Sequence, residues 1–243
     1  MRNIKLVVGL ASAMVLAPSL FASLSVTLYQ DTGNYSAGDG GEFRAVGNAD
    51  LNSVVDWSAY SAATSASQQY FQTFCTETSE YFTPGNTYTI SSIGNNALYN
   101  GTDHPVPITL GVAYLYSQFA AGTLAGYDYG YGSGRVLSAG NLQQAIWYLL
   151  GEYQDGAQVA GAALDALKAV TGTGPGDVFA SSADWTSAAN GAFGVQDMVL
   201  STPGQAQDQL VIVPEPTTMI AGALLLLPFG VSTVRILRRN RMA

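Results

Sequence analysis

Two apolar segments near the ends of this 243-residue chain limit what can fold as its globular part. The first, residues 1–23, has two basic residues, then a short apolar run, then small residues. This order is typical of a secretory signal peptide that is cleaved near its small residues. We therefore expect an exported protein that loses residues 1–23. A retained membrane anchor is the alternative interpretation, and the shortness of the apolar run disfavours it.

The second segment, residues 217–234, carries no charged residue. As a helix it would extend about 27 Å, which is close to the hydrocarbon thickness of a bilayer. Four arginines follow it and favour a cytoplasmic end. We expect a transmembrane helix over 217–234 with an Arg-rich tail, and a body that lies outside the inner membrane.

The residues around this span carry a specific resemblance. Pro214, Glu215 and Pro216 precede the span, and the arginine cluster closes the chain. This three-part order, over residues 214–243, resembles the PEP-CTERM sorting signal of Gram-negative bacteria that make exopolysaccharide. The resemblance implies an exosortase-type processing enzyme as a partner and a transient membrane attachment. It also implies a final location at the cell surface, in the outer membrane or in the extracellular matrix. A plain C-terminal anchor is the alternative.

The body between these segments is strongly acidic. Residues 26–213 hold three basic residues against sixteen acidic ones, which gives a net charge of −13. Such a surface repels phosphate backbones, so we expect no nucleic-acid partner. Hydrophobic residues make up 48% of the chain, which is sufficient for a buried core.

Periodicity predicts a single α+β domain over residues 24–213. Alternating runs predict strands within 23–33, 38–46, 86–93, 195–201 and 208–213. Helical spacing of apolar residues predicts helices within 107–124, 141–154 and 156–174. We expect an antiparallel-rich sheet packed with two or three helices. For residues 107–124 a buried strand is the alternative.

The chain contains one cysteine, Cys75, and one histidine, His104. A lone thiol in an exported protein cannot close an internal disulfide and is liable to oxidation, so it calls for a chemical explanation. One explanation is a hydrolase or transamidase in which Cys75 is the nucleophile and His104 the base. The turn-like surroundings of His104 in "GTDHPVP" disfavour it. A simply buried cysteine is a further alternative. Neither a metal site nor a cofactor is expected, since one Cys and one His lack ligand spacing.

A glutamine offers a different partner. "FCTE", residues 74–77, resembles the aromatic-Cys block of bacterial thioester domains, and "LQQAIW", residues 142–147, resembles their T-Q-x-A-I-W block. In that family the Cys sulfur and the Gln side chain join as an internal thioester, with loss of ammonia. The domain is an adhesive tip on surface proteins of mainly Gram-positive bacteria. The resemblance assigns the bond to Cys75 and Gln143, with Leu142 where the family usually has threonine.

The residue types also suit this chemistry. A carboxamide is a poor electrophile, so thiol attack on Gln143 requires close positioning and a stabilised oxyanion. With Asn141 as helix cap, Gln143 would lie in the first turn, where free backbone N–H groups are available. A helix start at Ser138 is the alternative. Glu77, two residues after Cys75, is a candidate helper that orients the reacting groups or carries a proton.

A finished thioester must also be kept from water. The candidates for a dry shell are Phe71, Phe74, Trp147, Tyr148 and the Tyr-rich loop 127–131. The sequence thus predicts an exported protein whose Cys75–Gln143 thioester attaches covalently to an amine or hydroxyl of a partner protein or polysaccharide. The reaction is single-use, so enzymatic turnover is not expected. The alternatives are a structural or binding protein of the exopolysaccharide matrix and the Cys–His enzyme.

Overall fold

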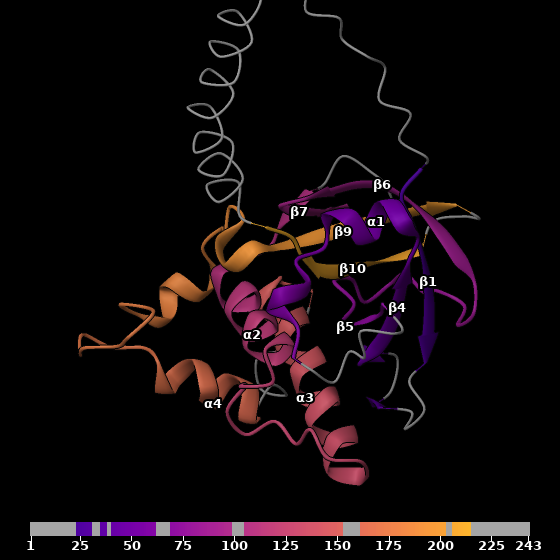
Figure 1. Cartoon of the computed structure of the whole chain (residues 1–243). Coiled ribbons are helices and arrows are strands. Elements are labelled where there is room, and N and C mark those ends of the chain that lie inside the picture. Colours follow the sequence, from indigo (N-terminus) through magenta and orange to yellow (C-terminus); the bar gives the residue numbers. More distant parts are fainter. Residues whose placement is uncertain are drawn as a thin grey trace, which may run out of the picture.

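A computed structural model of the chain describes residues 23–30, 35–37, 40–61, 69–98, 105–152, 161–202 and 206–214. These residues form a mixed α+β body in which an antiparallel sheet packs against helices (Figure 1). Residues 1–22 of the predicted signal peptide and the predicted membrane helix 217–234 lie outside the described residues. Within the described ranges, no helix is long and apolar enough to cross a membrane.

The main sheet has six strands in the order β10-β9-β6-β1-β4-β5, and every neighbouring pair is antiparallel. The strands are β1 (Ser25–Gln30), β4 (Phe43–Gly47), β5 (Phe71–Thr73), β6 (Thr87–Gly94), β9 (Val195–Thr202) and β10 (Ala206–Ile212). In β1 the period of two places Val26 and Leu28 in the core and leaves their neighbours half-buried. β10 is instead buried along its whole length.

The two edges of this sheet meet. Residues 74–76, which follow β5, run antiparallel to residues 208–210 of β10. The N–H of Leu210 donates to the carbonyl of Phe74, and the N–H of residue 76 donates to the carbonyl of residue 208, both at 3.1 Å. We call these two paired segments the seam. The seam satisfies backbone groups that an open edge strand would leave unpaired.

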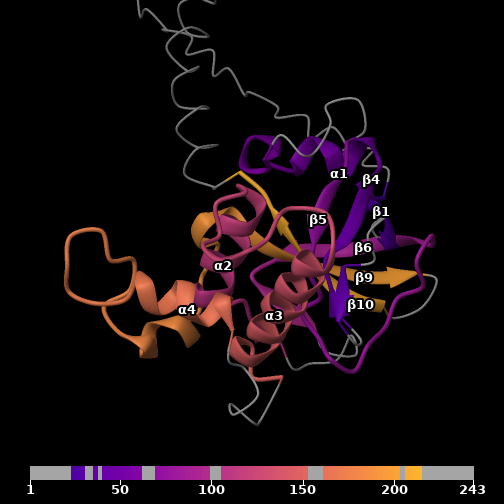
Figure 2. The same cartoon turned by 90° about the horizontal axis from the view of Figure 1, so that it is seen from below.

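Helices lie beside the sheet, with α2, α3 and α4 grouped on one side of it (Figures 1 and 2). The α-helices are α1 (Ala49–Val54), α2 (Leu110–Ala120), α3 (Ser133–Leu149) and α4 (Ala162–Ala169). The side chain of Thr109 caps α2 by accepting a hydrogen bond from the N–H of Val112. Gly151 follows the C-terminal end of α3 with φ +81°, a left-handed conformation that glycine adopts without strain.

Short elements connect these units. They comprise the strand pairs β2 (Ser36–Ala37) with β3 (Gly40–Gly41) and β7 (Asn96–Leu98) with β8 (Pro105–Pro107), and the 3₁₀ turns η1 (Trp57–Ala59), η3 (Ser182–Thr186) and η4 (Ala192–Gly194). Of these, β2 and β3 pack against α3. This contact brings a glycine pair to the helix that carries Gln143.

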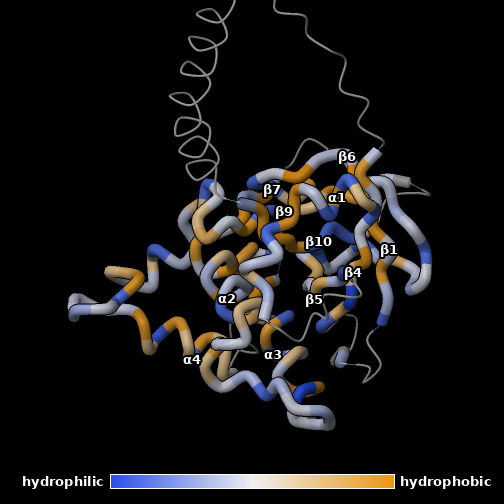
Figure 3. The backbone as a smooth tube through the Cα atoms, viewed as in Figure 1, coloured by the Kyte–Doolittle hydropathy of each residue, from blue (hydrophilic) through white to orange (hydrophobic). Residues whose placement is uncertain are grey.

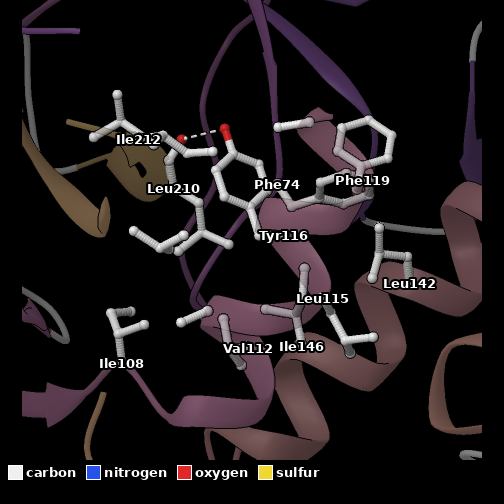
Figure 4. Packing of buried hydrophobic residues seen from close by; sticks show 14 of the residues in the cluster. Phe74, Ile108, Val112, Leu115, Tyr116, Phe119, Leu142, Ile146, Leu210 and Ile212 are labelled. Atoms are coloured by element: carbon white, nitrogen blue, oxygen red, sulfur yellow. Dashed lines mark hydrogen bonds between the residues drawn. The ribbon is translucent and has the colours of Figure 1, made fainter. Parts of the chain in front are cut away.

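The hydrophobic core lies where α2 and α3 meet the sheet (Figure 4). Hydrophobic residues recur along the strands and helices that surround it (Figure 3). Within this core, the hydroxyl of Tyr116 on α2 donates to the carbonyl of Leu210 at 3.1 Å. This bond ties α2 to β10 at a residue of the seam.

The predicted α+β class with an antiparallel sheet is confirmed. Residues 107–124 contain the helix α2, and only the last residue of β8 falls within this range, so the alternative of a buried strand is wrong. The described residues hold four α-helices, one more than the highest number predicted, because α1 is a six-residue helix that the sequence pattern did not reveal.

Candidate functional site

Cys75 and Gln143 meet inside the protein. Cys75 is fully buried, and only 1% of Gln143 is exposed. Oε1 of Gln143 accepts a hydrogen bond from the N–H of Cys75 at 3.0 Å, and its Nε2 donates to the carbonyl of Cys75 at 2.7 Å. Two sequence blocks that are 68 residues apart, one on the seam and one on α3, therefore converge at one point.

Oε1 of Gln143 also has a second donor. The N–H of Gly41 in β3 lies 3.3 Å from the same oxygen. Two backbone N–H groups that converge on one carbonyl oxygen have the arrangement of an oxyanion hole. Negative charge that develops on Oε1 during attack on the side-chain carbonyl carbon would therefore meet donors that are already in place.

Gly40 allows β3 to approach α3 this closely. A Cβ atom at position 40 would lie 2.6 Å from Cγ of Gln143 and 2.8 Å from Cζ2 of Trp147. Real Cβ atoms essentially never come within 3.0 Å of other heavy atoms, so position 40 requires glycine. The glycine pair of β3 thus forms one wall of the site.

The sulfur of Cys75 has a polar neighbour that sequence reasoning missed. Nε2 of the fully buried Gln209 donates to Sγ at 3.2 Å and to the carbonyl of Gln207 at 3.2 Å. Burial raises the pKa of the Cys75 thiol, the Gln209 hydrogen bond lowers it, and the charge of Glu77 raises it. The thiol is therefore held neutral, with a donor that can stabilise charge on sulfur.

Gln209 carried no chemical motif in the sequence. The one available signal was a glutamine within "DQLVIV", a run that is otherwise apolar after its aspartate. A polar side chain in a fully buried strand requires an internal partner. The pattern gave no indication that the partner is a cysteine sulfur.

A small aromatic shell surrounds Cys75. It consists of Phe43 and Trp147, with the partly buried Phe82 packed against them. The rings of Phe43 and Phe82 meet edge to face with 4.7 Å between their centroids. Trp147 is the member of this shell that the sequence predicted.

The other predicted shell residues lie elsewhere. Phe71 and Phe74 are buried in the main core, where Phe74 contacts Phe119 with 4.9 Å between ring centroids. Tyr148 is 36% exposed and Tyr131 is 90% exposed, so neither of them shields the site from water. Consecutive helical positions point in different directions, which separates Tyr148 from the buried Trp147.

Gln143 does not occupy the first turn of its helix, as we had expected with Asn141 as cap. α3 begins at Ser133, ten residues before Gln143, and its N-cap is Gly132. The free N–H groups of a helix start are therefore distant, and the donors come from Gly41 and Cys75. The early turns contain serines and glycines, which are weak helix formers, so the local pattern placed the start too late.

Glu77 directly follows the seam and is buried beside a group of acidic side chains. Its Oε2 accepts a hydrogen bond from the N–H of Asp208 at 3.0 Å. Burial and the nearby Asp208 raise the pKa of Glu77 to about 9, and burial raises the pKa of Asp208 to about 7. Burial, then the charges of Asp208 and Glu77, raise the pKa of Asp197 well above its ordinary value. The role of Glu77 as a chemical helper stays a prediction.

The burial of Cys75 is also what the alternative of a simply buried cysteine requires. His104, the base of the alternative Cys–His pair, lies outside the described residues. Among the residues that the structure describes, no group of acidic, Cys or His side chains has an arrangement that could hold a metal ion.

Comparisons of the chain with protein-family models, with curated proteins and with solved structures gave no match. Function must therefore be argued from the geometry and chemistry of the site.

Proposed function

We propose that this is an exported surface or matrix protein whose body carries an internal thioester between Cys75 and Gln143. One observation carries the proposal: the N–H groups of Gly41 and of Cys75, the residue that bears the thiol, both donate to Oε1 of Gln143. A buried amide oxygen needs a donor in any case. What supports the proposal is that the amide of Gln143 is held by both backbone groups of the only cysteine of the chain.

Bond formation proceeds in two stages. Sγ of Cys75 attacks Cδ of Gln143, and the carbonyl electrons move to Oε1 between the two N–H donors. The Cδ–Nε2 bond then breaks, and the nitrogen takes the thiol proton and leaves as ammonia. The product is a thioester, and the chain has lost about 17 Da. Because the proton passes within the site, no free thiolate is required despite the raised pKa of Cys75.

The thioester is an electrophile held for one use. An amine or hydroxyl of a partner protein or polysaccharide attacks Cδ of Gln143, and the same two N–H groups stabilise the oxyanion. The Cδ–Sγ bond breaks, Cys75 leaves with a proton as a thiol, and the partner stays on Gln143 through an amide or ester. The shell of Phe43, Phe82 and Trp147 limits hydrolysis by water before that event.

Export completes the proposal. A signal peptide over residues 1–23 and a PEP-CTERM-like segment over 214–243 would deliver the body to the cell surface or matrix, with an exosortase-type enzyme as the processing partner. There a covalent bond formed through Gln143 would serve adhesion to another surface or to the cell's own matrix.

Intact mass of the purified protein tests the proposal. We expect a mass about 17 Da below that of the sequence, absent in Cys75→Ala and Gln143→Ala, and addition of methylamine to the wild type alone. A full mass, with a thiol that reacts once the protein is unfolded, would refute the thioester and favour a matrix protein with a simply buried cysteine. Loss of hydrolysis of a defined substrate in His104→Ala would favour the enzyme.

A further inference from the structure

The residue after the oxyanion donor Gly41, Glu42, belongs to a buried ion pair. Glu42 is fully buried, and its carboxylate accepts two hydrogen bonds from the guanidinium of Arg135 on α3. Nε donates to Oε2 at 2.9 Å, and Nη2 donates to Oε1. This bidentate geometry fixes both the distance and the orientation of the two groups.

Three tyrosines complete the surroundings of the pair. The hydroxyl of Tyr127 donates to Oε2 of Glu42 at 2.8 Å, and Nη1 of Arg135 donates to the carbonyl of Tyr129 at 2.9 Å. The guanidinium lies over the ring of Tyr35, 4.6 Å from its centroid. Burial of two charges is costly unless each is paired and hydrogen-bonded, and here both are. The network is therefore built to hold one geometry.

Arg135 and Gln143 belong to the same helix. They are eight residues apart, which corresponds to about 12 Å along the axis and about 80° around it. α3 therefore holds residues 40–42 at two points: the Glu42–Arg135 ion pair, and the contact of Gly41 with Gln143. The ion pair contacts neither Sγ of Cys75 nor the side-chain carbonyl of Gln143. However, Glu42 is the next residue after Gly41, whose N–H does contact that carbonyl.

We propose that the Glu42–Arg135 pair positions the oxyanion donor. It holds the N–H of Gly41 on Oε1 of Gln143 and thereby sets the rate at which the thioester forms and the rate at which amines open it. This inference rests on the proposed thioester. Apolar packing alone would keep β3 near α3, but a displacement of about 1 Å at the donor is enough to slow such a reaction by about 100-fold.

The test compares Glu42→Gln with Asp165→Asn in the full chain. Glu42→Gln keeps the shape of the side chain and removes its charge, whereas Asp165→Asn removes one partner of the exposed Asp165–Lys168 pair. Intact mass follows the loss of ammonia after refolding and the incorporation of methylamine. We expect both rates to fall by about 10- to 100-fold in Glu42→Gln, at temperatures where the variant is folded, and to be unchanged in Asp165→Asn.

A second readout does not depend on the thioester. In a Cys75→Ala background no bond can form, and hydrogen exchange of the Gly41 amide reports its hydrogen bond to Gln143. We expect faster exchange at Gly41 when Glu42→Gln is added, without a matching change in the interior of α2. If Glu42→Gln does not fold, Arg135→Lys, which keeps the charge and loses the bidentate geometry, takes its place with the same expectations.

The outcomes separate the two proposals. Wild-type rates and unchanged Gly41 exchange in the variant would overturn the positioning role and leave the thioester intact. A wild-type protein without the mass deficit would overturn the thioester. In that case the Gly41 exchange still decides whether the ion pair holds β3 against Gln143, and unchanged exchange would overturn that as well.

Discussion

Replacing Gly40 by alanine would push β3 away from α3. The new Cβ would lie 2.6 Å from Cγ of Gln143 and 2.8 Å from Cζ2 of Trp147. Non-bonded carbon atoms rest at about 3.5–4.0 Å, so the backbone of residues 40–41 and the helix must separate by about 1 Å. Neither partner can rotate aside, because Gln143 and Trp147 are both buried.

This displacement has two separable consequences. Overpacking of a buried contact costs about 1–3 kcal/mol of stability. The N–H of Gly41, which is 3.3 Å from Oε1 of Gln143 in the wild type, moves to about 4 Å and leaves hydrogen-bonding range. Loss of one oxyanion-hole donor slows acyl transfer by about 100- to 1,000-fold. We expect that slowing in the formation of the Cys75–Gln143 bond.

The assay is the time course of ammonia loss by intact mass after refolding, accompanied by thermal unfolding. Gly94→Ala is the control, because a Cβ at position 94 would meet no atom within 4 Å. We expect Gly40→Ala to lower the unfolding temperature by about 2–4 °C for each kcal/mol lost, and Gly94→Ala to match the wild type in bond formation. Bond formation at the wild-type rate in Gly40→Ala would refute the reasoning that the closeness of β3 supplies the oxyanion donor.

Three further predictions follow from the site and the seam. Gln209→Leu removes the donor on Sγ of Cys75 and should slow bond formation, measured by intact mass; an unchanged rate would exclude Gln209 from the chemistry. Methylamine should destabilise the protein by about 4 kcal/mol in denaturant titrations, because it opens a cross-link that closes a loop of 68 residues; equal midpoints before and after would contradict this. In Cys75→Ala the unfolding temperature should rise as the pH falls from 9 to 5, because Glu77 and Asp208 have raised pKa values and bind protons more tightly in the folded protein. This stabilisation is complete below their ordinary pKa near 4 and is lost as the pH rises through about 7 to 9. Glu77→Gln should make the unfolding temperature less dependent on pH.

Local sequence patterns were sufficient for the class of fold, and they singled out two residues, Cys75 and Gln143, that the structure places in contact. Periods of two and 3.6 predict the strands and helices, and the pairing of Cys75 with Gln143 was suggested by the order of two short blocks and by the lone thiol. The contact between these two residues in the structure agrees with that pairing. The thioester itself stays a proposal.

The supporting residues of the site could not be predicted in the same way. Gly41 lies in a Gly-rich run and Gln209 in a strand, and neither type of residue carries a motif. Gly41 reaches Gln143 because β3 packs on α3, and Gln209 reaches Cys75 because β10 pairs with the segment after β5 at the seam. The start of α3 was misjudged for a similar reason: Arg135, in its first turn, is paired with Glu42, which is 93 residues away and invisible to local periodicity.

The seam also determines how the protein would bear mechanical load. With a partner joined to Gln143 and the C-terminal segment attached to the cell, a pulling force would enter on α3 and leave after β10. Only the chain from residue 143 to residue 214 connects these two points. Within it, β10 is hydrogen-bonded to β9 on one side and to residues 74–76 on the other. A strand paired on both sides resists being drawn out along its axis, because its hydrogen bonds must break together. The segment that carries Cys75 would thus continue to strengthen the adhesion after its own bond had been opened.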